Sequence, residues 1–170
     1  YTHMTLLAET NEGMHNLFRA SSLASMEGYY FKPRMDRELL QTYGRGVIAT
    51  TGCVGGEVQT RLRLGQYAEA KKAAAEFQDI FGKENFFLEL MDHGIPIEKE
   101  VRDDLLRLGK DLDLPPVATN DCHYTHPEDA DAHDALICVA SGKSVADPNR
   151  LRFQGGGYYI KSAREMRDLW

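Results

Sequence analysis

The chain has 170 residues, of which 42% are hydrophobic and 27% are charged, a composition typical of a globular domain with a sizeable core. Its formal net charge is −6, from 20 basic and 26 acidic side chains, so the chain as a whole is a poor non-specific binder of nucleic-acid phosphates. There is no apolar run of about eighteen residues and no basic-then-apolar leader. We therefore expect neither a membrane span nor a signal peptide.

The three cysteines, Cys53, Cys122 and Cys138, are an odd set without a CxxC spacing. This argues against a disulfide framework and favours a reducing, cytoplasmic location. The chain starts at Tyr1, and strand-like residues begin at once, which we interpret as a piece of a longer protein.

Short apolar runs alternate with amphipathic segments along the chain. Strands are predicted at residues 3–8, 47–50, 86–91 and 116–119, with a last short one at 158–160. Helices are predicted at 11–24, from Asp36, from 57, at 66–81, from Pro96, at 128–139 and after Ser162. Strand–helix alternation predicts an α/β fold of parallel strands with flanking helices, either doubly wound or closed into a barrel. In both architectures the active site collects at the carboxyl ends of the strands.

Four candidate metal ligands lie at or near ends of these strands. His3 opens the first strand, Cys53 follows the second, and Asp121 with His123 follows the fourth. An Asp-x-His pair on an extended backbone points an oxygen and a nitrogen donor to one side, which suits zinc, manganese or iron. The alternative interpretation of Cys53 is a small buried residue, and that of His3 is an ordinary strand histidine.

Other polar residues have simpler interpretations. Cys122 and Cys138 are predicted to pack in the core, and His93 is predicted to be a turn histidine. Glu89 is the one charge in an apolar strand, so it needs a partner. The glycine-rich turn at 52–56 lacks the Lys and Ser/Thr of a P-loop, and tight turning explains it.

Four segments in order resemble a known family: YTHMTLLAETNEGMHNL, GVIATTGCVGGEVQTRL, NFFLELMDHG and LPPVATNDCHY. They are similar to the PHP domain of bacterial DNA polymerase III alpha subunits, most of all the actinobacterial ones. The resemblance covers nearly the whole chain. It implies a single PHP domain over 1–170, as part of a distorted (β/α) barrel of about seven strands.

The resemblance also implies a metal centre. Its ligand positions fall on His3, Cys53, Asp121 and His123, which are all intact. It implies divalent ions, zinc or manganese with magnesium or iron as alternatives, up to about three in the complete domain. The family's other ligands, with the first barrel strands, and the polymerase domains have no counterpart in these residues. We therefore expect little or no activity from this segment alone.

The implied chemistry is metal-dependent phosphodiester hydrolysis, in particular 3'–5' proofreading of DNA, with Asp121 and His123 as the catalytic ligands. The expected partners are DNA through the parent polymerase, the sliding clamp and a proofreading subunit. One alternative is a structural metal-binding scaffold that braces the polymerase and docks that subunit. Another is a small-molecule phosphoesterase of the histidinol phosphatase type.

Overall fold

The computed structural model describes all residues from 1 to 170. They form two compact units, one of residues 1–89 and 101–117, the other of residues 90–100 and 118–170. The prediction of one domain over the whole chain stays a prediction. None of the helices is long and apolar enough to cross a bilayer.

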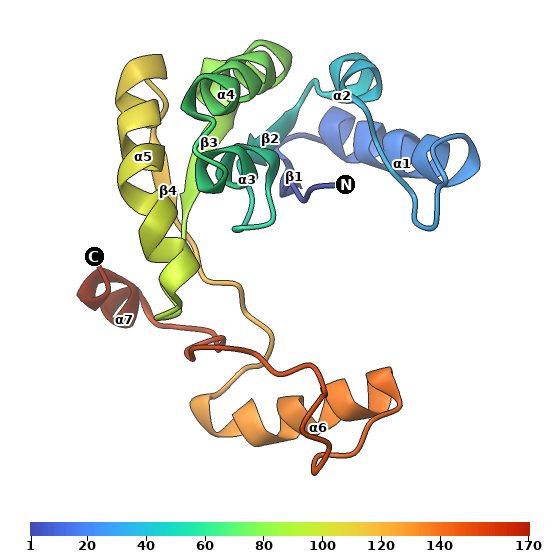
Figure 1. The fold of residues 1–170 in the computed structure, drawn as a ribbon. Helices are drawn as coiled ribbons and strands as arrows, with labels where there is room; N and C mark the ends of the chain where they lie inside the picture. The colour runs from blue at the N-terminus through green and yellow to red at the C-terminus, as the bar shows by residue number, and fades with distance from the viewer. The chain divides into compact units, whose positions relative to one another are not determined.

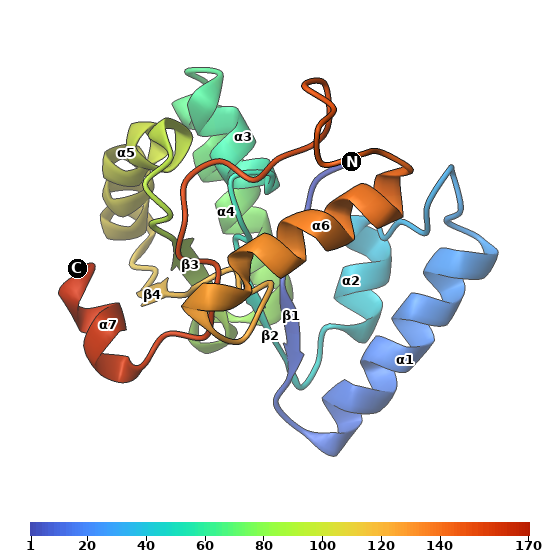
Figure 2. The same cartoon turned by 90° about the horizontal axis from the view of Figure 1, so that it is seen from below.

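The elements follow the predicted alternation (Figures 1 and 2). In chain order they are β1 (Leu6–Ala8), α1 (Asn11–Met26), α2 (Arg37–Tyr43), β2 (Val47–Thr50), α3 (Glu57–Arg63), α4 (Tyr67–Phe81), β3 (Phe86–Leu90), α5 (Pro96–Leu112), β4 (Pro116–Ala118), α6 (Ala130–Ser141) and α7 (Ala163–Asp168). Short 3-10 turns at Lys83–Asn85 and Pro127–Asp129 precede β3 and α6. The predicted last strand at 158–160 is wrong, because that stretch carries only an isolated bridge between Tyr124 and Tyr159.

Helix starts follow from local capping chemistry. The side chain of Thr10 accepts a hydrogen bond from Gly13 N at 3.0 Å at the start of α1, and Asp36 accepts from Leu39 N at 2.9 Å at the start of α2. These side chains satisfy backbone amides that a helix leaves without partners. Gly82 ends α4 with φ of 88°, a conformation that suits glycine.

The four strands form one sheet in the order β1-β2-β3-β4. Strands β2 and β3 are parallel, as predicted, but β1 runs antiparallel to β2, with Leu6 opposite Ala49 and Ala8 opposite Val47. The predicted α/β class is confirmed, whereas the predicted direction of the first strand is wrong. Because β1 is reversed, residues before it lie beside the carboxyl end of β2, where Thr50 N donates to Thr5 O at 3.1 Å.

The core of the first unit lies between the sheet and the helices α4 and α5. Phe86 of β3 is fully buried and packs on Phe77 and Phe81 of α4, at ring-centroid distances of 5.9 and 6.4 Å. The predicted apolar stripe of α5 is buried at Val101, Leu105 and Leu108. Phe86 is the first residue of β3 and pairs with Ala49, so this packing fixes the start of β3 beside the carboxyl end of β2, which Cys53 follows.

In the second unit, the guanidinium of Arg150 is buried and forms a two-pronged ion pair with Asp134 of α6. Ser162 caps α7, and Glu165 reaches back to the Ser162 amide at 2.8 Å, which completes a capping box. These side-chain contacts fasten the long loop after α6 and the last helix, which the sequence left with few apolar anchors.

Candidate metal centre

The structure brings His3 and Cys53 to one turn at the end of β2. His3 N donates to Gly55 O at 3.1 Å, and His3 forms a bridge with Gly56. A Cβ built on Gly55 would lie 3.6 Å from both Cys53 Sγ and His3 Nδ1, so the two donor atoms border the same small space. The proximity of these two candidate ligands depends on the reversal of β1. If β1 ran parallel to β2, the residues before β1 would lie beside the amino end of β2, at the opposite end of the strands.

Hydrogen bonds from Gln59 of α3 hold the turn that carries Cys53. The buried amide of Gln59 donates from Nε2 to Gly52 O at 2.7 Å and to Thr51 Oγ1 at 2.9 Å. Gly55 N also donates to Cys53 Sγ at 3.4 Å, which orients the sulfur. The glycine-rich turn is therefore a tight turn, as predicted, and its hydrogen bonds determine where the thiol points.

The odd charge in β3, Glu89, is buried beside this turn and has partners. Thr50 Oγ1 donates to its carboxylate in a short hydrogen bond, and Thr5 Oγ1 lies 3.4 Å from the same oxygen. Its backbone amide donates to Thr51 Oγ1 at 3.0 Å. A buried carboxylate with such partners stabilises the ends of β1, β2 and β3 as one assembly.

The second unit brings Asp121 and His123 together after β4. His123 Nε2 lies 3.3 Å from Asp121 Oδ2, and both side chains are partly exposed. The backbone between them is not extended as predicted, because Cys122 N donates to Asn120 O at 2.8 Å. That bend exposes Cys122, so the prediction that Cys122 packs in the core is wrong, whereas Cys138 is buried as predicted.

Aromatic rings surround His123. Phe153 meets it edge-on at 4.6 Å, His133 of α6 lies at 5.3 Å and Tyr158 at 5.9 Å. His123 N donates to Tyr158 O at 2.7 Å, which ties the loop before α7 to this residue. Burial raises the pKa of Tyr158, and the nearby carboxylates of Glu98 and Asp121 raise it further. Tyr158 therefore stays a neutral ring that supports the imidazole.

His93 lies in the bend after β3, as predicted for a turn histidine, and its side chain is buried there. Its side chain is 4% exposed, its ring stacks on Tyr158 at 4.2 Å, and its Nδ1 lies 2.7 Å from Glu98 Oε1. Glu98 also accepts from His93 N at 2.6 Å. The pair therefore supports one face of the Tyr158 ring, a role that no local sequence signal could reveal.

The donor set fits a divalent cation. Imidazole nitrogens, a thiol and a carboxylate are the ligands that zinc takes, and without the thiol they suit manganese or iron. Within each unit the structure assembles two of these donors, and no group of three or more His, Cys, Asp or Glu side chains gathers in metal-binding proximity. Each unit by itself thus contributes a pair of potential ligands.

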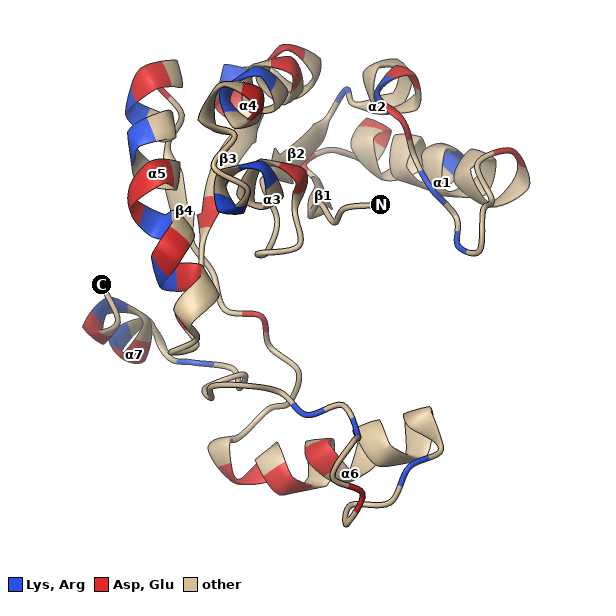
Figure 3. Cartoon of the chain, viewed as in Figure 1, with Lys and Arg blue, Asp and Glu red and all other residues tan.

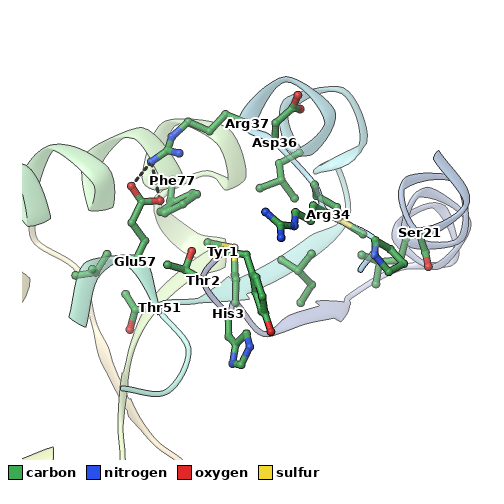
Figure 4. A pocket seen from close by; sticks show the side chains of 17 residues that line it. Tyr1, Thr2, His3, Ser21, Arg34, Asp36, Arg37, Thr51, Glu57 and Phe77 are labelled. Carbon is green, nitrogen blue, oxygen red and sulfur yellow. Dashed lines mark hydrogen bonds and ion pairs between the residues drawn. The ribbon is translucent and has the colours of Figure 1, made fainter. Parts of the chain in front are cut away.

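A cavity of about 640 Å³ opens in the first unit beside His3 (Figure 4). Its walls come from the chain's first residues and β1, from α1, α2 and the connector between them, and from α3 and α4. The lining includes the apolar side chains of Leu6, Leu17 and Phe77 and the side chains of Arg34 and Arg37.

A profile of the family described as "PHP domain" matches residues 1–93 of the chain. The chain belongs to the PHP domain family. This membership accounts for the sheet of mostly parallel strands flanked by helices, as predicted for a PHP-type distorted barrel. The matched part contains His3 and Cys53 and ends before Asp121 and His123.

Relatives of this PHP chain cover its whole length. It is 62% identical over 170 residues to "DNA polymerase III subunit alpha" of Saccharopolyspora erythraea. It is 57% identical over 171 residues to the protein of the same name from Mycobacterium tuberculosis, and 40% identical over 170 residues to that of Treponema pallidum. Each comparison covers 100% of this chain and 14% of the relative, so the chain spans about one seventh of those proteins' length.

Proposed function

We propose that this PHP chain is a segment of a replicative DNA polymerase III alpha subunit and supplies ligands to a centre that hydrolyses phosphodiesters. The observation that carries the proposal is the pairing of donors, His3 with Cys53 and Asp121 with His123, in a chain whose relatives carry that name. His3 and Cys53 are fifty residues apart in the sequence, so the fold brings them together, whereas Asp121 and His123 are two residues apart and lie close through the local backbone.

The side chains have distinct roles in this proposal. His3 and Cys53 would hold a cation at the end of β2, and Asp121 with His123 would supply a carboxylate and an imidazole ligand. A bound divalent cation would polarise a phosphoryl oxygen and lower the pKa of a water molecule. Phe153, His133 and Tyr158 limit the rotation of His123, which keeps Nε2 beside Asp121.

The proposed substrate is a DNA 3' end, and the proposed reaction is 3'–5' proofreading. The expected partners are the sliding clamp and a proofreading subunit, which a polymerase of this type uses at a replication fork. The ion would be zinc or manganese, with magnesium or iron as alternatives, because the set mixes N, S and O donors.

The test uses the full-length subunit that contains this chain, free of any other nuclease subunit. Asp121→Asn removes the charge of one ligand, and we expect it to lower the rate of 3'-end degradation of a 5'-labelled single strand about a hundredfold or more. Asp79→Asn is the matched control, because Asp79 is an exposed carboxylate on α4. Hydrolysis at the normal rate by Asp121→Asn would rule out this centre as the nuclease.

A second function is favoured by a different observation, the exposed apolar face of α6. Leu136 and Val139 are exposed there, which suits a surface that another part of the replicase covers. On this alternative the metal is structural and the chain is a scaffold. Chelation would then lower the melting temperature of the full-length subunit, and Asp121→Asn would do the same without affecting a nuclease rate.

A further inference from the structure

The connector between α1 and α2 is an exposed loop of aromatic side chains. Tyr29, Tyr30 and Phe31 are 64%, 64% and 78% exposed. Tyr30 N donates to Lys32 O at 3.1 Å, which closes a tight turn with Phe31 at its tip. Phe31 has φ of 60°, a conformation that costs free energy in a residue with a side chain. The turn therefore holds three large rings in water instead of burying them.

The cations of this loop lack carboxylate partners. Arg34 places its guanidinium over the rings of Tyr1 and Tyr30, at 5.1 and 4.9 Å, and Lys32 Nζ lies 5.7 Å from the Tyr1 ring. Arg34 Nε is buried without a hydrogen-bond partner. Arg37, the other arginine at the cavity, is by contrast neutralised by Glu57 and Glu76, at 3.1 and 2.6 Å.

The loop borders the cavity that His3 lines. Pro33 and Arg34 form one wall of that cavity, and Tyr1 stands between Arg34 and His3 (Figure 4). Figure 3 shows basic positions along this connector in a chain whose overall charge is −6. A local positive charge with free hydrogen-bond donors fits an anion, and the exposed rings beside it fit flat apolar groups.

We propose that residues 28–34, the aromatic loop, bind single-stranded DNA and lead its 3' end toward the cavity beside His3. Bases stack on exposed aromatic rings without regard to sequence, and unpaired cations bind the phosphates between them. The inference rests on the proposed nuclease function, because it assigns the substrate-binding surface of the same centre. An apolar protein partner would leave Lys32 and Arg34 uncompensated at the interface, which favours a polyanion as the occupant.

The first experiment measures binding alone. The probe is 5'-fluorescein-labelled oligo(dT) of about twenty nucleotides, titrated by fluorescence anisotropy into the full-length subunit in EDTA, where no hydrolysis occurs. We expect Tyr30→Ala with Phe31→Ala to weaken binding about fivefold or more. Arg34→Gln and Lys32→Gln should each also reduce the slope of log affinity against log salt by about 0.7. Lys110→Gln on α5 removes one exposed charge elsewhere and should change neither the affinity nor the slope beyond error.

A second measurement locates the contact within the large subunit. Oligo(dT) with 5-bromodeoxyuridine near its 3' end is cross-linked by ultraviolet light, and the attached peptide is identified by mass spectrometry. Attachment within residues 28–34, lost in the Tyr30→Ala and Phe31→Ala variant and retained in Lys110→Gln, would support the proposal. Unchanged affinity and salt slope in all loop variants would overturn the proposal. So would a Phe31→Cys variant whose new thiol does not react with maleimide in the absence of DNA, because the loop would then be covered.

The outcomes separate this inference from the nuclease proposal. If the loop variants bind DNA more weakly but Asp121→Asn degrades DNA at the normal rate, the hydrolytic centre is refuted and the DNA-binding loop is supported. Loss of hydrolysis in Asp121→Asn with full binding by every loop variant would refute the loop and keep the centre.

Discussion

Gly56 offers the sharpest test of how the turn at Cys53 is built. A Cβ at this position would lie 2.1 Å from Thr51 O and 2.8 Å from Gln59 Oε1, whereas carbon contacts prefer about 3.5 Å. Gly56→Ala must therefore move the turn by more than about 1 Å, at an overpacking cost of about 1–3 kcal/mol. The hydrogen bond from Gly56 N to Cys53 O, 2.8 Å long, is expected to be lost as well, for about 1 kcal/mol.

The combined cost of about 2–4 kcal/mol corresponds to a melting temperature about 5–15 °C lower for a chain of this size. Thermal denaturation followed by circular dichroism measures it. The neighbouring Gly55→Ala is the matched control, because its Cβ would meet only Cys53 Sγ and His3 Nδ1, each at an ordinary 3.6 Å. A Gly56→Ala protein that melts within about 2 °C of the parent would refute this account of the turn.

Gly55→Ala makes its own prediction about metal binding. The added methyl group would occupy the space that the Cys53 and His3 donors border, so we expect about tenfold weaker metal binding in a protein of nearly normal stability. Competition with a chromogenic chelator measures the affinity. Unchanged affinity would show that these two side chains do not share an ion at this point.

Two further predictions concern packing and titration. Phe86→Ala removes a fully buried ring that packs on Phe77 and Phe81, so we expect the free energy of unfolding measured in urea to fall by about 3–5 kcal/mol. Leu64→Ala is the control, because it shortens an exposed side chain and should change stability little. Hydrogen bonds from Tyr159, and then from Ser162, lower the pKa of Glu165 from 4.5 to about 2. The ionised Glu165 carboxylate therefore stabilises α7 fully above the pKa that it has in the unfolded chain. This stabilisation is lost as pH falls from about 4.5 to 2. Amide exchange of α7 across that range should show the loss in the parent, and Glu165→Gln should be nearly independent of pH there.

Much of the fold could be predicted because its signals are local. The caps Asp36 and Ser162, the helix end at Gly82 and the strand Val47–Thr50 all depend on residues within a few positions of each other. The direction of β1 could not be predicted in the same way. A three-residue strand shows the same side-chain alternation in either direction, and only its contacts with β2 decide which one forms.

Strand-end positions, with the family resemblance, pointed to His3, Cys53, Asp121 and His123, and their role as metal ligands stays a prediction. The fold brings His3 to Cys53, whereas Asp121 and His123 are close because they are near neighbours in the sequence. The burial of His93 depends on Tyr158, a residue far along the chain, so no local pattern could show it. The free charge of Arg34 is likewise a property of three-dimensional surroundings, because the sequence places Asp36 close to it without pairing them.

Because the first strand is reversed, the number of residues between His3 and Leu6 determines where the His3 imidazole lies. From His3 to the first paired residue of β1 there are only Met4 and Thr5, so no flexible loop separates the histidine from the sheet. A strand advances about 3.3 Å per residue and alternates its faces. One inserted residue before Leu6 would preserve the strand and its pairing, yet it would carry the imidazole away from the thiol and turn it to the other face. Substitutions in this stretch should thus be far better tolerated than any change in its length.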